Sequence, residues 1–254
     1  METFLNIISF ENFRPQTKLK IFAKYIPSQF IFQLRLYNLS STWIAENLDA
    51  LCVRYVRRWV EAPVSSCIKQ WLISPSKYCG LGIPSFQSRA ENLKIGKRYA
   101  LKNSPNENIR ELWSDSIKDN ITSDSLLQQF SLKQAINCNK EAQTKAASDH
   151  FLTLGSQGKI AKAVSEYIPS KQITNWSKIV DLLPGHVYNF VRKAVQSQLP
   201  TFDNLHRWGR APSNLCPMCG FIQTNKHVLS NCSSNGALSR YTIGHNKALK
   251  ILIH

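Results

Sequence analysis

Four potential metal ligands lie close together in the last fifth of the chain. Cys216, Cys219, His227 and Cys232 follow the spacing C-x2-C-x7-H-x4-C within the segment CPMCGFIQTNKHVLSNC. Zn²⁺ prefers four thiolate or imidazole ligands in a tetrahedron, and a C-x2-C turn directs two thiolates at one ion. Because the protein would fill all four positions, the spacing predicts one structural Zn²⁺ per chain. The alternative is a chance grouping of four residues in a basic protein.

The other cysteines show no paired spacing. They are Cys52, Cys67, Cys79 and Cys138, and the total of seven is odd. In a cytosolic or nuclear protein this pattern favours metal binding over a disulfide framework. We therefore expect these four side chains to be small apolar residues of the interior.

Motifs for phosphate-loop binding or nucleophilic catalysis are weak. The segment from Gly80 to Pro84 lacks the Lys-Ser/Thr pair of a phosphate loop, so we expect a structural turn there. His150 and His186 are present, but no arrangement of nucleophile, base and orienting residue stands out around them in the sequence. An enzyme with an unrecognised site is therefore the least favoured class of function.

The charge of the chain points to a polyanionic partner. Its 254 residues include 32 lysines and arginines against 16 aspartates and glutamates, a net charge of +16. Residues 1–102 and 151–254 each carry +9, whereas residues 103–150 carry −2, which suggests a boundary near 103–106. We favour nucleic acid over an acidic membrane surface. A basic surface without a ligand is the simpler alternative.

Hydropathy excludes two other classes. No run of 18 apolar residues is present, so we expect no membrane span. The opening METFLNIISFENF has no basic region before its apolar residues, so it is not read as a signal peptide and we expect no secretion.

Apolar spacing predicts a mainly α protein. Helices are expected over 18–37, with a break or kink at Pro27, over about 40–59, and over 85–102. The segment CIKQWLISPSKYCGLGIPSF, residues 67–86, contains the breakers Pro75, Gly80, Gly82 and Pro84, which predict a short extended segment and a tight turn. Further helices are expected over 107–120, 123–147, 157–167 and 185–197.

Basic residues at the helix ends are candidate phosphate contacts. Arg54, Arg57 and Arg58 fall in the last turns of the helix at 40–59. The other candidates are Lys94, Lys97 and Arg98 on the next basic helix, and Arg207 and Arg210 before the cysteine cluster. Cations at the end of a helix also stabilise its dipole, so the arginines at 54, 57 and 58 have an equally plausible structural role.

The order of these motifs resembles a known family. Residues 199–232 resemble the zinc-knuckle region of non-LTR retrotransposon reverse transcriptases, in the group with a C-terminal restriction-like endonuclease. The matching residues are Leu199-Pro200-Thr201, Asn204-Leu205, Arg207-Trp208-Gly209, the four ligands and the stretch from His227 to Cys232. Residues 240–246 resemble the step that follows that knuckle. Upstream, PQTKLKIFAKYIPSQFIFQLRLYNLS, TWIAENLDALCVRYVRRWV and GLGIPSF are similar to the family's thumb domain. The family often has glycine where Cys79 stands.

The resemblance implies an organisation and a function. A helical thumb would occupy 1–102, a helical linker 103–198, and the zinc-knuckle region 199–254. The thumb would hold a template–product duplex, and the knuckle would contact target DNA or element RNA. The implied partners are DNA and RNA, without a membrane, together with the polymerase and endonuclease portions of the parent protein. The implied location is the nucleus.

The resemblance also implies that catalysis resides elsewhere. Reverse transcription needs carboxylates that bind two divalent ions, and the family carries these in a palm domain before the thumb, on two adjacent aspartates. This sequence contains no Asp-Asp pair, and residues 233–254 contain no acidic residue for a nuclease. We therefore expect a non-catalytic, nucleic-acid-binding fragment. The alternative is a domesticated zinc module that binds protein partners.

Overall fold

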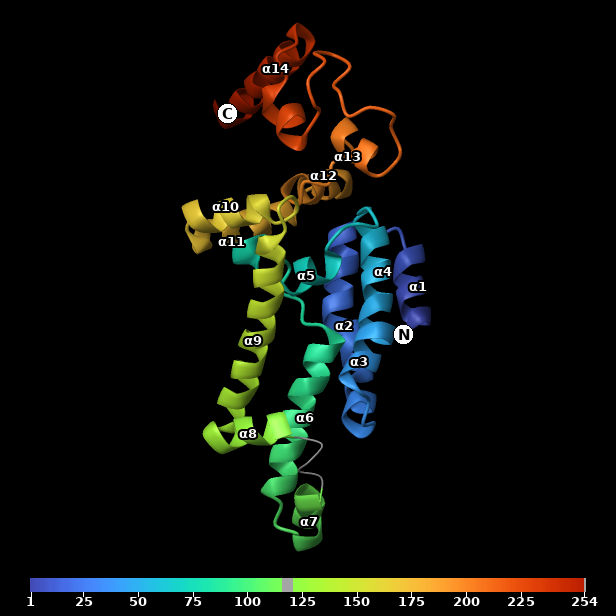
Figure 1. Ribbon diagram of the computed structural model, residues 1–254, viewed down its shortest axis with the longest axis vertical. Coiled ribbons are helices and arrows are strands. Elements are labelled where there is room, and N and C mark those ends of the chain that lie inside the picture. The colour runs from blue at the N-terminus through green and yellow to red at the C-terminus, as the bar shows by residue number, and fades with distance from the viewer. Residues whose placement is uncertain (116–120, 254) are drawn as a thin grey trace. The chain divides into compact units, whose positions relative to one another are not determined.

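The computed structural model describes residues 1–115 and 121–253, and the chain separates into two compact units (Figure 1). The first unit comprises residues 1–192 and the second residues 193–254. The boundary falls near the end of helix α12 (Gly185–Val195). Each unit is described by itself below.

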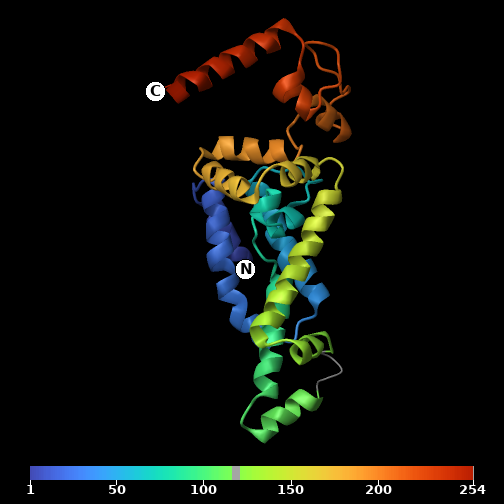
Figure 2. The same cartoon turned by 90° about the vertical axis from the view of Figure 1, so that its left-hand side faces the viewer.

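The first unit is built from helices. In chain order they are α1 (Glu2–Phe10), α2 (Pro15–Leu36), α3 (Ser41–Ile44), η1 (Ala45–Asp49), α4 (Ala50–Trp59), α5 (Ile68–Ile73), η2 (Ser76–Tyr78), α6 (Phe86–Lys102), α7 (Glu107–Asp115), α8 (Ile121–Gln129), α9 (Leu132–Thr153), α10 (Lys159–Tyr167), α11 (Ser170–Val180) and most of α12. Helices α1, α2 and α4 pack together (Figure 1), and α6 contacts both α2 and α9. The long helices α2 and α9 can be followed along the unit in Figure 2. The largest fully buried side chains include Trp71, Phe86 and Leu5.

Helices α3, η1 and α4 follow one another without a break, and the middle segment is a π-helical turn. Ser40 caps the start, since its Oγ accepts a hydrogen bond from the Trp43 N–H at 3.1 Å. The π turn contains Asp49, whose carboxylate accepts from the Phe86 N–H at 2.7 Å and the Gln87 N–H at 3.3 Å. Asp49 therefore satisfies free N–H groups at the start of α6, a helix that begins 37 residues later.

The second unit contains α13 (Phe202–Arg207), the π-helical turn η4 (His227–Asn231) and α14 (Asn235–Ile253). The connection between α13 and η4 contains one isolated antiparallel bridge, Leu215 with Ile222. The small core of this unit consists of Cys216, Cys232 and Ala237, with Cys219 and Tyr241 packed against it.

The expected mainly α fold is confirmed, and the described residues form no β-strand beyond that bridge. The helices expected at 40–59 and 85–102 are present with closely similar ends. The described residues contain no helix that is both long enough and apolar enough to cross a bilayer.

Several local expectations were wrong. Of the break or kink expected at Pro27, the break is absent: α2 continues through the proline, because burial of Leu19, Ile26 and Leu34 holds the helix on its neighbours even though the proline lacks an N–H. Residues 68–73 form α5 rather than an extended segment, since they bury Ile68, Trp71 and Leu72. The helix expected over 123–147 is two helices, α8 and α9, separated at Ser131, which caps α9.

Other helices were not expected from the sequence. These are α1, α11, α13 and α14. The expected helix over 107–120 is present as α7 as far as Asp115, and its last five positions lie outside the described residues.

Candidate metal centre and nucleic-acid interface

A tight hairpin presents the first two thiols of the cluster. The Gly220 N–H donates to the Cys216 carbonyl at 2.8 Å, and the Cys216 N–H donates to the Phe221 carbonyl at 2.7 Å. Gly220 has a φ of +75°, a left-handed conformation that a residue without a Cβ adopts at little cost. The bend therefore turns the chain back directly after Cys219.

The turn η4 supplies the other two ligands. His227 is its first residue, and its N–H donates to the Thr224 Oγ1 at 3.2 Å. Cys232 follows η4 directly. Tyr241 of α14 donates its hydroxyl to the carbonyl oxygens of His227 and Val228, at 3.2 and 2.9 Å. Helix α14 thus fixes the turn that carries the imidazole.

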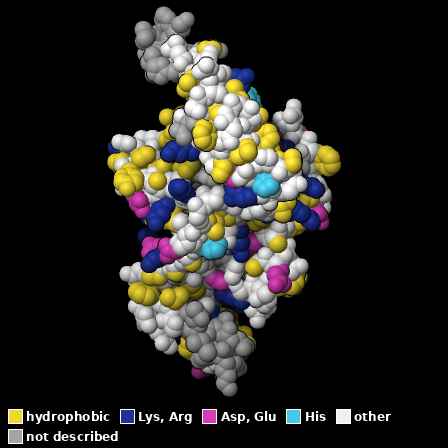
Figure 3. Space-filling view, turned by 45° about the horizontal axis from the view of Figure 1, so that its top comes forward, with side chains coloured by type: hydrophobic (Ala, Val, Ile, Leu, Met, Phe, Trp, Pro, Cys, Tyr) yellow, Lys and Arg dark blue, Asp and Glu magenta, His cyan; other side chains and the backbone are white. Residues whose placement is uncertain are grey.

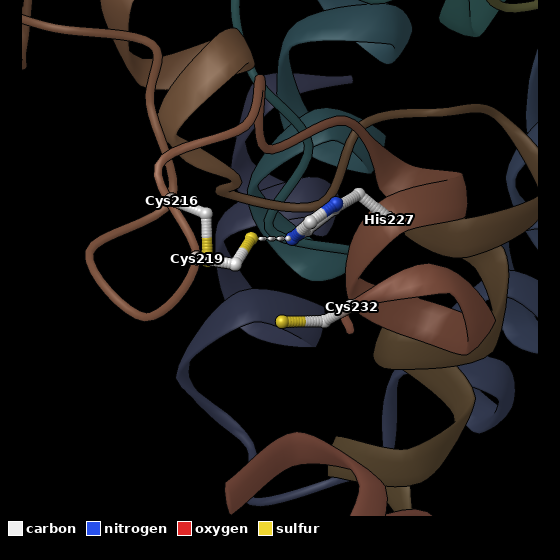
Figure 4. A group of neighbouring side chains, drawn as sticks. All are labelled: Cys216, Cys219, His227 and Cys232. Atoms are coloured by element: carbon white, nitrogen blue, oxygen red, sulfur yellow. Dashed lines mark hydrogen bonds between the residues drawn. The ribbon is translucent and has the colours of Figure 1, made fainter. Parts of the chain in front are cut away.

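The four side chains converge on one point (Figure 4). One ligand atom from each of Cys216, Cys219, His227 and Cys232 lies within 4.8 Å of the others. The His227 Nε2 is 3.3 Å from the Cys219 Sγ. Cys216, His227 and Cys232 are buried, and Cys219 is partly buried. The group can hold one metal ion.

The surroundings of the cluster favour thiolates at two positions. Burial opposes ionisation of the Cys216 thiol, but hydrogen bonds from the Met218 N–H, His227 and Gln223 lower its pKa to about 6. The hydroxyl and N–H of Ser234 lower the pKa of Cys232. The Cys216 thiol therefore ionises readily at neutral pH, and the resulting thiolate is the form that binds a metal.

Gln223 is a supporting residue that the sequence did not reveal. Its Oε1 accepts from the Phe202 N–H at 2.9 Å, while its Nε2 lies 3.7 Å from the Cys216 Sγ. Gln223 therefore ties the start of α13 to a thiol of the cluster. The sequence places Gln223 in the loop between Cys219 and His227, but the other residues of that loop have the same property, so Gln223 could not be singled out.

The three arginines of α4 are placed unequally. The Arg54 Nη2 is 2.9 Å from the Glu2 Oε1, and its guanidinium lies 5.8 Å from the centre of the Tyr55 ring. Arg58 is exposed and lies at the same distance from that ring. Arg57 is half-buried, and its Nε has no hydrogen-bond partner among the described residues. The structure thus brings Arg54 and Arg58 together around one aromatic ring.

The three basic residues of α6 have different environments. Lys97 is exposed, and the Lys94 Nζ donates to the Leu39 carbonyl at 3.3 Å. Arg98 is buried, and its guanidinium pairs with both carboxylate oxygens of Asp124, at 2.9 and 2.6 Å. Because that charge is neutralised in the interior, the expectation of a phosphate contact at Arg98 is corrected to a structural role.

The two arginines before the cluster are exposed. The Arg207 Nη2 is 3.2 Å from the Asp203 Oδ2 and also contacts Asn204. The Arg210 N–H donates to the Leu205 carbonyl at the end of α13. On the face drawn in Figure 3, lysine and arginine side chains are interspersed with apolar ones. Contact of these cations with phosphate stays a prediction.

The comparisons with known proteins agree with the sequence pattern. One curated relative is the "Retrovirus-related Pol polyprotein from type-1 retrotransposable element R2" of Nasonia vitripennis, which is 26% identical over 226 residues. This similarity supports a relation to retrotransposon proteins. The match covers 86% of this chain but 20% of that protein, so the chain spans about a fifth of the relative's length. No protein-family model matches the chain.

Proposed function

We propose that this chain is a nucleic-acid-binding portion of a non-LTR retrotransposon reverse transcriptase, an RNA-directed DNA polymerase. The observation that carries the proposal is the 226-residue similarity to a retrotransposon polyprotein. The net charge of +16 supports it, because a basic surface attracts the phosphates of DNA and RNA.

The proposed division of labour follows the resemblance of the motifs. Residues 1–102 act as the thumb and hold a template–product duplex by its backbone. Residues 103–198 are the linker, and residues 199–254 contact target DNA or element RNA. A thumb must follow a duplex of any sequence, so phosphate contacts suit it better than base contacts. Catalysis is assigned to palm and endonuclease portions of the parent protein, which acts in the nucleus.

The cluster in the second unit is proposed to hold one structural Zn²⁺. Three thiols and one imidazole are the donor set of structural zinc sites. The set would complete a tetrahedral shell, so the ion would brace the fold and leave no position for a substrate.

The salt dependence of binding tests the proposal. Each phosphate contact contributes about −0.9 to the slope of log affinity against log salt for duplex DNA. Replacing Arg54, Arg57 and Arg58 by glutamine should therefore flatten that slope by about two to three. The measurement is fluorescence anisotropy with one duplex and one of scrambled sequence, and both should weaken equally.

A matched control separates a local contact from the general charge. Lys162, Lys171 and Lys178 are exposed on α10 and α11, and their change to glutamine removes the same three charges. This control should leave the slope nearly unchanged. An equal slope for the wild type and the arginine variant would contradict the thumb contact and leave those arginines as helix-end cations.

A second candidate is a zinc module that binds protein partners. The exposed apolar side chains of Leu215, Phe221 and Ile222 beside the cluster favour it. Binding through such a surface would depend little on salt, so the same titration distinguishes the two functions.

A further inference from the structure

A recess in the first unit lies between the end of α2 and the outer half of α6. It has a volume of about 270 Å³. Its lining residues are Leu34, Arg35, Tyr37, Asn38, Leu93, Lys94, Lys97, Arg98, Leu101 and Leu112. Lys94, Lys97 and Arg98 are the basic residues of α6 described above, and the recess places them beside apolar side chains.

The lining of the recess combines an apolar surface with an aromatic side chain. Four leucines contribute to it, and Leu34 is buried while Leu93 and Leu101 are partly buried. Tyr37 is 63% exposed, so its ring is available to a ligand. Asn38 adds an exposed amide, which can both donate and accept hydrogen bonds.

The charges of the lining have one sign. Arg35 and Lys97 are exposed, and Lys94 donates to the Leu39 carbonyl while it lines the recess. No aspartate or glutamate is among the described residues that line it. The fourth cation, Arg98, is neutralised by Asp124 in the interior. The ligand that fits this lining is therefore an anion with a flat apolar part.

A second cavity in the same unit has a lining of mixed charge and serves as a comparison. That cavity, of about 750 Å³, lies between Tyr78 and α9 and is lined by cations such as Lys140 and Lys145. Glu141 and Asp149 also line it, so its charge is mixed. This mixed lining favours neither an anionic nor a cationic ligand, whereas the lining of the recess at α2 and α6 favours an anion.

We infer that the recess binds one unpaired nucleotide of a single-stranded nucleic acid. The base would lie against the leucines and the Tyr37 ring, with the Asn38 amide at its edge and the phosphates beside Arg35 and Lys97. Bases stack on aromatic side chains in single-strand binding proteins, while cations follow the backbone. In a duplex the base faces are covered by their neighbours, so a paired strand would leave the leucine lining unused. The inference rests on the proposed function and specifies the form of nucleic acid that this site takes.

The test removes the aromatic side chain and the amide without changing the charge. Tyr37→Ala combined with Asn38→Ala should weaken binding to a short fluorescein-labelled single strand by between about fivefold and about a hundredfold, the range expected for one stacked base. Binding to a blunt duplex of the same sequence should stay unchanged. Tyr37→Phe retains the ring and should bind the single strand as the wild type does. Tyr167→Ala is the matched control, because Tyr167 is 82% exposed on α10 and does not line the recess.

The outcomes separate this inference from the proposed function. If the double variant loses single-strand and duplex binding equally, or loses neither, the inference about the recess is overturned while the proposed function stands. Failure of the wild type to bind any nucleic acid would overturn both. Competition for the recess by an acidic peptide, without single-strand binding, would assign it to a protein partner instead. A melting temperature like that of the wild type shows that the double variant is folded.

Discussion

At the scale of single residues, the buried cysteines differ in how readily their thiols ionise. Cys52 and Cys79 are buried, and burial raises the pKa of both thiols. Cys216 and Cys232 are also buried, yet hydrogen bonds lower the pKa of each. Cys67 and Cys138 are only partly buried, so the expectation of an interior position holds for Cys52 and Cys79 alone. The grouping of Cys216, Cys219, His227 and Cys232 was predictable, because a C-x2-C turn is a local feature that needs no knowledge of the fold.

The ligand set can be tested at one residue. Cys219→Ser should reduce the zinc content of the purified protein to well below one ion per chain, because a hydroxyl is a poor zinc ligand and no fifth ligand joins the group among the described residues. Plasma emission spectrometry measures this content. Cys138→Ser on α9 is the control and should keep its zinc. Wild-type protein that purifies without metal under zinc-replete conditions would contradict the site.

The ion pair between Arg98 and Asp124 predicts how stability depends on pH. Burial opposes the Asp124 carboxylate, but hydrogen bonds from Arg98 and Trp113 hold the pKa of Asp124 below its ordinary 3.8. A depressed folded-state pKa means that the unfolded chain takes up the proton first. The contribution to stability is therefore complete well above pH 4 and is lost as the pH falls toward the folded-state pKa.

Asp124→Asn should remove that contribution and leave the Arg98 charge buried without its partner. We expect a loss of about 3 kcal/mol near neutral pH, the scale for breaking a buried pair. Urea denaturation at several pH values measures it. The difference between variant and wild type should shrink as the pH is lowered below 4. A constant difference across that range would show that the ion pair does not account for the loss.

At the scale of the element, the sequence predicted helices where an apolar stripe was long. The stripe at 40–59 gave the extent of the continuous helix from α3 to α4. The sequence pattern could not predict α5, because a helix of six residues is too short to show a stripe, and burial of Trp71 against the rest of the unit stabilises it. The cap that Asp49 gives to α6 joins residues 37 positions apart, so no local pattern contains it.

The end of α4 has a feature that engineering can test. Glu61 has a φ of +50°, its N–H donates to the Arg58 carbonyl, and the Ala62 N–H donates to the Arg57 carbonyl. These bonds form a Schellman motif, whose left-handed position usually holds glycine. The same pair of bonds closes α13, and there the position is Gly209 with φ +67°.

Glu61→Gly should therefore stabilise the first unit by about 0.5 to 1 kcal/mol, because glycine adopts this conformation without the strain of a Cβ. Thermal denaturation followed by circular dichroism measures the gain. Glu61→Ala removes the carboxylate but keeps the Cβ, so it should give no comparable increase. A gain of equal size in the alanine variant would assign the effect to charge instead of backbone conformation.

At the scale of the whole molecule, the two units have different sources of stability. The first buries large side chains such as Trp71, Phe86 and Phe151 in an apolar core. The second has a core of Cys216, Cys232 and Ala237, of which two are ligands of the cluster. A core this small rarely stabilises a fold without a metal or a disulfide. The proposed zinc should therefore be essential to one unit and irrelevant to the other.

Removal of the metal tests this difference in the intact chain. Incubation with a strong zinc chelator should raise amide hydrogen exchange across residues 212–241, because binding of a structural zinc is coupled to folding. Exchange in α2, α4 and α6 should stay at the level of the untreated protein, since their protection comes from apolar packing. Added Zn²⁺ in excess of the chelator should restore the protection, which distinguishes loss of the ion from damage to the protein. Unchanged exchange around Cys216 and Cys232 after complete metal removal would mean that the second unit folds without the ion.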